Sequence, residues 1–339
     1  MKKLLSLVLA AILLLSVCAT ASASVYEGQR VRIVIGSTST SGDSYMVAET
    51  VNRYLSKYLN CNSKVDAVGA NEAFATIATA KADGLTFMIF HDMTYLGVLF
   101  GSYDEEYKLE NMTVGPRVGQ NPGSCFAAKK GLPYQTLAEA AEYLANNPSE
   151  KVRIAVESGG VSHVGFVAYY NWVKEKYGED VASRIKIVIG GSTDKKLQLI
   201  WDNNCDIIFA DYSSLLQYTQ EGVDDQLALV WAGMMDYIDG VEVPVMADQG
   251  ITLNGEPFVF SKDFLIYLPK GVSQEVLDEL DAAMAQVAAD PDFVADMQAL
   301  TYKPNVLSSK EAQEFIYAKR DSIASLVAAA PAFDDLTDD

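Results

Sequence analysis

A loop of glycine, serine and threonine at residues 36–44 is the part of this chain best suited to bind a ligand. It follows an apolar stretch, Val31 to Ile35, and precedes a helical pattern that begins at Met46. The first backbone N–H groups of a helix have no intrahelical partners, and the helix dipole is positive there. Such a loop therefore binds a carboxylate or phosphate without a charged side chain. The alternative is a polar turn with a serine or aspartate N-cap.

Residues 1–23 have the three parts of a secretory signal peptide: two lysines, an apolar run from Leu4 to Leu15, and a small-residue cleavage site. We expect a mature start at Ser24. The alternative is a lipoprotein signal that ends at Cys18, although Val17 is bulky where a small residue is wanted. No second apolar run approaches the roughly 20 residues that span a bilayer. The sequence therefore predicts an exported protein, periplasmic or at the cell surface.

The chain is strongly acidic, with a formal net charge of −19 over 339 residues. Loss of a leader that carries two lysines makes the mature chain more acidic still. A field of this sign repels nucleic acid and anionic membrane surfaces, which we exclude as partners. It also requires that local donors hold any anionic ligand against the overall field.

Three cysteines follow the leader, at Cys61, Cys125 and Cys205. They allow at most one internal disulfide, and the sequence does not say which pair would form it. No Cys-x-x-Cys motif or Cys/His cluster occurs, and the chain has only two histidines. We therefore expect no metal site. No dinucleotide, Walker or calcium-loop pattern predicts another cofactor.

Short β-branched runs alternate with longer amphipathic stretches, which predicts two α/β lobes with parallel sheets covered by helices. The predicted strands are Val31–Ile35, Phe87–Phe90, Val152–Val156, Ile185–Ile189 and Asp206–Phe209. The predicted helices are Met46–Leu59, Leu137–Asn146, His163–Tyr177 and Lys195–Asp202. Towards the C-terminus, Ser273, Asp290-Pro291 and the capping box Ser308-x-x-Glu311 each predict a helix start.

Ligands of parallel α/β sheets bind at the carboxyl ends of the strands, where the strand-to-helix loops converge. This rule predicts that five loops lie together, at residues 36–44, 91–94, 157–162, 190–194 and 211–214.

Several short segments occur in a fixed order along the chain. They are Arg32-Ile33-Val34 with Gly42-Asp43, Val68-Gly69-Ala70-Asn71, Ala82-Asp83-Gly84-Leu85-Thr86, Ser158-Gly159 with Ser162-His163, Gly191-Ser192 with Asp206, Leu268-Pro269-Lys270-Gly271-Val272, and Ala289-Asp290-Pro291. In this order and spacing the chain resembles the extracytoplasmic substrate-binding receptors of tripartite tricarboxylate transporters, the Bug family. The resemblance covers nearly the whole mature length.

The resemblance implies a two-lobed periplasmic binding protein fold, type II-like, with two interdomain crossings and a ligand cleft between the lobes. The lobes would comprise residues 24–124 plus 259–339, and residues 125–258. The crossings are expected around Cys125 to Lys129 and Phe258 to Leu268. Such a receptor closes on a small organic acid by a hinge motion and passes it to the permease subunits of a secondary transporter. We expect a monomer.

The family binds carboxylates through main-chain N–H groups and hydroxyls of two loops. By position, the first loop supplies Ser37, Thr38, Ser39, Thr40 and Asp43, and the second supplies Ser158, Gly159 and Ser162. Asn71, in a matched segment, is a further expected contact.

The chain departs from the family at two of these loops. The paired glycines of the first loop fall on Ser39 and Thr40, whose side chains narrow the ligand space. A Ser/Thr-type turn is replaced by His91-Asp92, which we also expect at the ligand.

Further acids lie near the same loops, at Asp43, Glu157 and Asp211. Together they would suit a ligand with a cationic or hydroxyl-rich part, as well as or instead of a plain tricarboxylate. The alternative is that Glu157 and Asp211 face solvent or cap the following helices. Tyr212, beside Asp211, is expected as an aromatic wall of the cleft.

Ser162 and His163 raise the possibility of a secreted hydrolase. The segment lacks the second glycine of a nucleophile elbow, and catalytic partners normally meet from separate loops. We therefore predict a structural role for His163 and no enzyme, although His91 leaves a hydrolase as an alternative. A second alternative is a receptor that reports to a membrane sensor in place of a permease.

Overall fold

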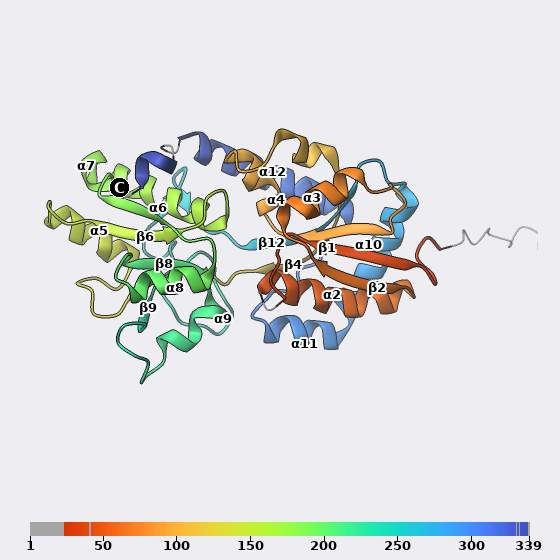
Figure 1. The fold of residues 1–339 in the computed structure, drawn as a ribbon, viewed down its shortest axis with the longest axis horizontal. Helices are drawn as coiled ribbons and strands as arrows, with labels where there is room; N and C mark the ends of the chain where they lie inside the picture. The colour runs from red at the N-terminus through yellow and green to blue at the C-terminus, as the bar shows by residue number, and fades with distance from the viewer. Residues whose placement is uncertain (1–23, 41, 330, 332, 338–339) are drawn as a thin grey trace, which may run out of the picture.

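The structure is a computed structural model that describes residues 24–40, 42–329, 331 and 333–337. The expected signal peptide and Cys18 lie outside the described residues. Two α/β lobes lie side by side (Figure 1). No helix within the described residues is long and apolar enough to cross a membrane.

The first lobe is built on a mixed five-stranded sheet of order β2-β1-β3-β12-β4. Its strands are β1 (Arg30–Ile35), β2 (Asn62–Ala67), β3 (Thr86–Phe90), β4 (Met112–Asn121) and β12 (Lys262–Pro269). β1 is parallel to β2 and β3, whereas β12 is antiparallel to β3 and β4. Along β1, Ile33 packs into one apolar cluster and Val34 into another. Both faces of the sheet are therefore covered.

Helices cover the two faces of this sheet. One face packs against α2 (Asp43–Leu59), α10 (Gln274–Ala289) and α11 (Pro291–Ala299), and the other against α3 (Ala70–Thr79) and α4 (Met93–Leu99). Two short 3-10 helices, η1 (Glu105–Tyr107) and η2 (Leu109–Asn111), lead into β4. As predicted, Ser273 caps α10 and Asp290 caps α11, which has proline at its first position.

The second lobe repeats this plan with a sheet of order β7-β6-β8-β5-β9. Its strands are β5 (Ser124–Lys129), β6 (Val152–Val156), β7 (Ile185–Ile189), β8 (Ile207–Asp211) and β9 (Leu229–Met234). The helices α5 (Leu137–Asn146), α6 (Val161–Tyr177) and α7 (Glu179–Ala182) pack on one face, and α8 (Thr193–Trp201) and α9 (Tyr212–Leu215) on the other. The 3-10 helix η3 (Leu216–Thr219) and a small hairpin of β10 (Thr252–Leu253) and β11 (Glu256–Pro257) complete it.

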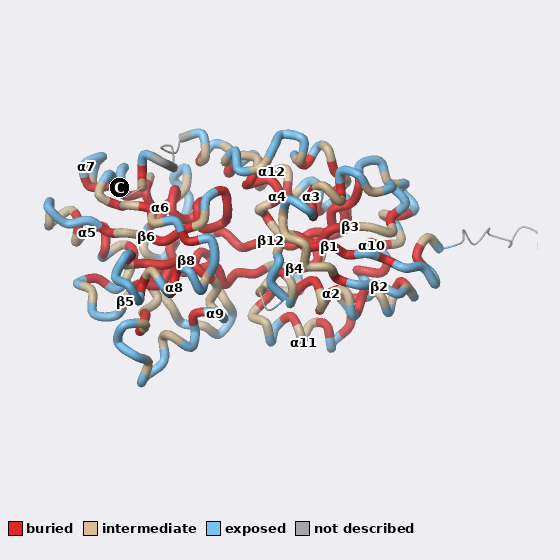
Figure 2. Tube along the Cα trace, in the orientation of Figure 1, coloured by how far each residue is buried: buried red, intermediate tan, exposed pale blue. Residues whose placement is uncertain are grey.

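The chain passes between the sheets at residues 122–123 and returns at residues 258–261. These connections are largely buried (Figure 2). The return is anchored by a hydrogen bond of 2.8 Å from the Phe260 N–H to the carbonyl of Met235.

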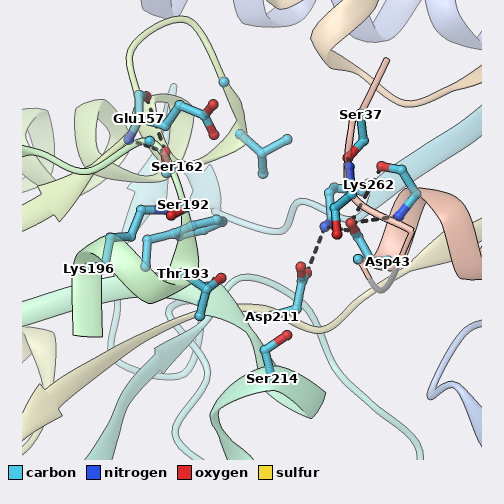
Figure 3. Close-up of a pocket in the computed structure, with 18 of the residues that line it drawn as sticks. Ser37, Asp43, Glu157, Ser162, Ser192, Thr193, Lys196, Asp211, Ser214 and Lys262 are labelled. Carbon is cyan, nitrogen blue, oxygen red and sulfur yellow. Dashed lines mark hydrogen bonds and ion pairs between the residues drawn. The ribbon is translucent and has the colours of Figure 1, made fainter. Parts of the chain in front are cut away.

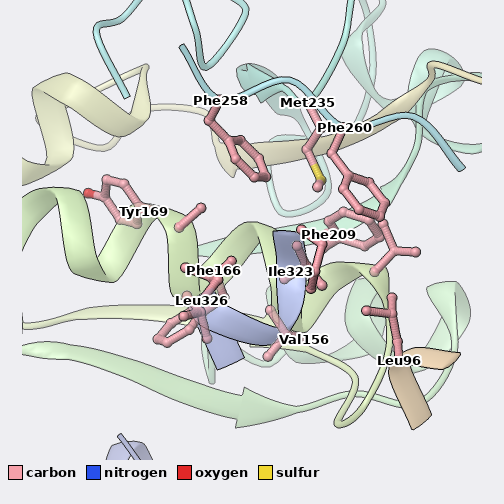
Figure 4. Packing of buried hydrophobic residues seen from close by; sticks show 14 of the residues in the cluster. Leu96, Val156, Phe166, Tyr169, Phe209, Met235, Phe258, Phe260, Ile323 and Leu326 are labelled. Atoms are coloured by element: carbon pink, nitrogen blue, oxygen red, sulfur yellow. The ribbon is translucent and has the colours of Figure 1, made fainter. Parts of the chain in front are cut away.

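A third link is α12 (Ser309–Ala329), which packs against β4 in the first lobe and α6 in the second. Ile323 and Leu326 of α12 join a buried cluster that includes Phe166 of α6 and Leu96 of α4 (Figure 4). After α12, the short helix η4 (Phe333–Leu336) leads to Thr337, which pairs with Ile187 of β7. The apolar core is therefore continuous from one lobe to the other.

The predicted alternation of strands and helices is confirmed, and the predicted parallel pairing holds for three strands of each sheet but not for the other two. In each sheet three parallel strands adjoin an antiparallel pair, and the strands flanking the crossings, β4, β5 and β12, belong to those pairs. β5 and β12 each enter their sheet directly from the other lobe, without a helical crossover from a neighbouring strand, and each is antiparallel to both of its neighbours. Residues 125–129, where the first crossing was expected, are β5 itself.

The three cysteines of the described chain, Cys61, Cys125 and Cys205, are all free thiols. Cys125 and Cys205 are buried within the second lobe, and burial raises the pKa of each thiol. They act as small apolar core residues.

Candidate ligand-binding site

A cavity of about 580 Å³ lies between the lobes, at the carboxyl ends of the parallel strands. All five loops that the sequence placed together contribute to its wall. The volume is within the usual range for small-molecule sites.

Apolar side chains supply part of the wall. Phe90 from the first lobe and Phe209 from the second both line the cavity. Gly36 is needed for this arrangement, because a Cβ atom there would lie 2.2 Å from Cζ of Phe90.

The N-termini of α2 and α6 open onto the cavity from the two lobes. Their N-cap residues, Gly42 and Gly160, both line it and have no side chain to cap the helix. At α2, Oδ1 of Asp43 accepts a hydrogen bond of 2.8 Å from the Ser44 N–H. At α6, Oγ of Ser162 accepts one of 2.8 Å from the Glu157 N–H, which fixes the loop ahead of the helix. Both helices thus direct the positive ends of their dipoles towards a ligand.

Lys262, the first residue of β12, bridges the two lobes inside the cavity (Figure 3). Its Nζ atom lies 2.7 Å from Oδ1 of Asp211 and is also paired with Asp43. Burial alone lowers the pKa of Lys262, but Asp211 and Asp43 raise it above the ordinary value. The lysine is therefore protonated.

The two carboxylates respond differently to the same lysine. Burial acts to raise the pKa of Asp43, but Lys262 outweighs it and the pKa is lowered to about 2. For Asp211 burial prevails over Lys262, and the pKa is raised. Asn121 donates a hydrogen bond of 3.0 Å to Asp211, so this carboxylate points inward rather than to solvent.

The wall of the second lobe carries a further lysine and a further acid, Lys196 and Glu157. Burial raises the pKa of Glu157 against the opposing effect of Lys196. Burial likewise lowers the pKa of Lys196 against the opposing effect of Glu157. Serine and threonine hydroxyls of the same wall, at Ser192, Thr193 and Ser214, also line the cavity.

His91 lies at the cavity as a neutral imidazole. Burial and the charge of Lys262 lower its pKa to about 3. Its Nδ1 accepts a hydrogen bond of 3.3 Å from the Met93 N–H, and its ring lies edge-on to Phe264. It can therefore contact a ligand without adding charge.

Asp92, by contrast, is directed away from the cavity and is completely buried. Its carboxylate pairs with Lys319 of α12 at 2.5 Å and accepts a hydrogen bond of 2.6 Å from the Asp263 N–H. Asp263 in turn pairs with Lys319 at 2.6 Å and with Arg117 at 3.0 Å. These four charges connect α4, α12, β4 and β12 beside the returning crossing.

The second predicted loop serves partly as a contact between the lobes. A Cβ atom on Gly159 would lie 2.3 Å from Oγ of Ser102 in the first lobe. The ring of His163 stacks on Phe100, with centroids 3.9 Å apart, and burial lowers its pKa to about 4. Tyr212 stacks on Trp231 at 4.8 Å.

Of the residues expected at the ligand, six line the cavity: Ser37, Ser39, Asp43, His91, Ser162 and Asp211. The others, which lie beside it or elsewhere, are Thr38, Thr40, Asn71, Asp92, Ser158, Gly159 and Tyr212. Sequence reasoning missed Lys262 and Lys196. No motif marked either residue, although a lysine within a predicted crossing, such as Lys262, is a signal that could be sought.

No group of three or more histidine, cysteine or acidic side chains in the described chain is arranged to hold a metal ion. The cavity instead contains one buried lysine, Lys262, paired with two acids, Asp43 and Asp211. The site can thus bind a small polar ligand by charge and hydrogen bonds.

No protein-family model and no curated protein sequence matches this chain. Its fold is nevertheless shared by solved structures. The periplasmic binding protein BugD superposes with a TM-score of 0.68 at 17% identity, over 91% of this chain and 99% of that one. MatC from Rhodopseudomonas palustris, solved with bound malate, gives 0.64 at 19% identity, over 87% of this chain and 99% of that one. Rpa4515 from R. palustris, solved with adipate, gives 0.66 at 16% identity, over 89% and 98% of the respective chains.

These similarities establish the predicted two-lobed periplasmic binding protein fold. At such identities they establish the fold alone.

Proposed function

We propose that the protein is an exported solute-binding receptor of the Bug type, which captures a small organic acid between its lobes and delivers it to a membrane permease. One observation carries this proposal: strand-to-helix loops from both lobes line a single cavity of about 580 Å³. A ligand that contacts both walls stabilises the closed arrangement of the lobes, and closure is the signal that a permease recognises.

The cavity supplies donors for one carboxylate. These are the α2 and α6 N-termini with their glycine N-caps, the hydroxyls of Ser192 and Thr193, and the ammonium of Lys196. The two neighbouring structures contain malate and adipate, which are small organic acids, and this supports the proposed ligand class.

We further propose that residues 1–23 direct export and are removed, and that the receptor acts as a monomer. The lobes would be residues 24–124 with 259–339, and 125–258, except that Ser124 already pairs within the second lobe and that the C-terminal segment reaches across to β7. Of the residues expected at the ligand, Ser37, Ser39, Asp43, His91, Ser162 and Asp211 stay as proposed contacts, in addition to the donors named above. Residues beside the cavity, such as Gly159 and Tyr212, would position those contacts.

No catalytic role is proposed for Ser162 or His163. The hydroxyl of Ser162 is engaged with the Glu157 backbone, accepting from its N–H and donating to its carbonyl at 3.2 Å. Nδ1 of His163 accepts a hydrogen bond of 3.3 Å from the Gly159 N–H. Both residues thus stabilise the loop that begins α6.

A thermal-shift screen of the mature protein against small acids tests the proposal. A ligand at a hundred times its dissociation constant stabilises the fold by about 2.7 kcal/mol. Scattering measurements with the active compound should then show a more compact molecule.

Two adjacent serines of α9 offer a matched pair of variants. Ser214 lines the cavity, whereas Ser213 is exposed outside it. Ser214→Trp should place a large side chain in the cavity and abolish the shift, and Ser213→Trp should retain it. Equal binding by both variants would place the ligand elsewhere.

A further inference from the structure

Lys196 is a buried cation within the candidate site. The residue is 4% exposed, and it lines the cavity. Its stem passes over Gly190, where a Cβ atom would lie 2.6 Å from Cγ of the lysine. Its Nζ atom lies 5.5 Å from the centroid of the Phe209 ring. The ammonium is thus held in a fixed place in the wall.

Within the described residues, Lys196 has no ion pair and its Nζ has no hydrogen-bond acceptor. Burial of most of the Lys196 side chain restricts the access of its ammonium to water to the side that faces the cavity, which disfavours the charged form. A bound anion would supply the missing partner.

Glu157 is an acidic side chain on the same wall of the cavity as Lys196. Its Oε2 lies 3.7 Å from the position that a Cβ on Gly160 would occupy, at the start of α6. In the described part of the chain its carboxylate forms no ion pair within 4.0 Å, although Lys196 is the nearby charge with the largest effect on it. Two opposite charges therefore face one cavity without contacting each other.

The other charges of the cavity disfavour a second carboxylate on the ligand. Its charged lining comprises four acids, Asp43, Glu157, Asp194 and Asp211, and two lysines. Lys262 is already shared between Asp43 and Asp211. A dicarboxylate would add two negative charges to this surplus, whereas a zwitterion adds none.

We propose that the ligand is a small amino acid, whose carboxylate pairs with Lys196 and whose ammonium pairs with Glu157. This inference rests on the proposed receptor function and specifies its substrate class. The zwitterion completes two charges that the protein leaves separated, and each pairing is a charge-assisted hydrogen bond in a partly dehydrated cleft.

Matched compounds that differ only in the amino group test the inference. We would titrate L-aspartate against succinate, L-glutamate against glutarate, L-leucine against 4-methylpentanoate, and 4-aminobutyrate against butyrate. At least one amine should bind at least tenfold more tightly than its deaminated partner. If deaminated acids bind as tightly as the amines, the receptor function stands and the amino-acid inference fails. If no acid or amine binds, both fail.

Variants then assign the two ends of the ligand. Glu157→Gln should weaken binding of the amino acid at least tenfold and leave the deaminated acid unchanged, whereas Lys196→Met should weaken both. Exposed residues of the same two types provide controls: Glu142→Gln and Lys195→Met should change neither. An equal effect of Glu157→Gln on amine and deaminated acid would overturn the assignment. Melting curves establish folding, and if a variant does not fold, the matched compounds on the unaltered protein decide.

Discussion

The Nζ atom of Lys262 lies 2.7 Å from Oδ1 of Asp211, which joins the strand returning to the first lobe with the last residue of β8 in the second. The same ammonium also pairs with Asp43 at the start of α2. The next residue, Asp263, points to the opposite side of the strand and pairs with Arg117 and Lys319. The returning crossing is thus fixed by charges on both sides.

Replacing Lys262 with methionine should destabilise the protein by about 3 kcal/mol at pH 7, because Asp43 and Asp211, which are largely but not fully buried, would remain without their cation. Urea unfolding measures the loss. Lys270→Met, an exposed lysine just after the same strand, should be nearly neutral. The deficit should shrink at pH 4, where the released carboxylates can protonate. A deficit independent of pH would contradict the role given to the ion pairs.

Lys319 should be as important on the other side of the crossing. Lys319→Met removes the partner of Asp92 and one partner of Asp263, and a loss of about 3 kcal/mol or more is expected. Lys310→Met, exposed near the start of α12, is the matched control. If both variants unfold at the same urea concentration, the buried network does not stabilise the fold.

His91 should make the fold less stable as the pH falls. The unfolded histidine takes up a proton near its ordinary pKa of about 6.5, whereas in the folded protein the pKa is lowered to about 3. Between these values the unfolded state binds more protons, so stability is lost on acidification, by about 1.4 kcal/mol per pH unit well below pH 6.5.

The measurement is urea unfolding between pH 7 and pH 5 for the unaltered protein and for His91→Asn, whose amide keeps an acceptor near the Met93 N–H. The variant should lose less stability on acidification. His163 remains in both proteins, so its own contribution cancels. If the two proteins lose the same stability between pH 7 and pH 5, His91 does not titrate in this way.

Any side chain introduced at Gly159 should destabilise the protein, for two reasons that can be tested separately. Its φ of +72° is unfavourable for other residues, at about 1–2 kcal/mol. A Cβ atom would also meet Ser102 of the other lobe. Gly101→Ala is the control, because Gly101 has the same φ with nothing within 4 Å. Gly159→Ala should cost more than Gly101→Ala, and adding Ser102→Gly should remove the excess. No recovery would mean that the contact between the lobes is unimportant.

Local signals in the sequence predicted local structure well. The β-branched runs of β6 and β7 were placed residue for residue, as was α5, and the caps at Ser273 and Asp290 formed as expected. The predictions that failed concern structure that depends on distant parts of the chain. β4 and β12 are defined by pairing with each other across the lobe, and no local pattern specifies that pairing.

The same limit applies to the candidate site. The converging loops followed from strand order, and the acids Asp43, Glu157 and Asp211 do gather at one cavity. Asp92 follows the same kind of strand end as His91, yet it is buried because Lys319, far along the chain, lies opposite it. Side-chain direction at such positions is decided by partners that the local sequence does not reveal.

The C-terminal segment has a consequence for solubility. β7 is an edge strand of the second sheet, and the pairing of Thr337 with Ile187 covers part of that edge. An uncovered edge offers its backbone N–H and C=O groups to strands of other molecules. The pairing of Thr337 therefore leaves fewer free backbone groups of β7 for strands of other molecules, and the residue that provides it follows a helix that packs against both lobes.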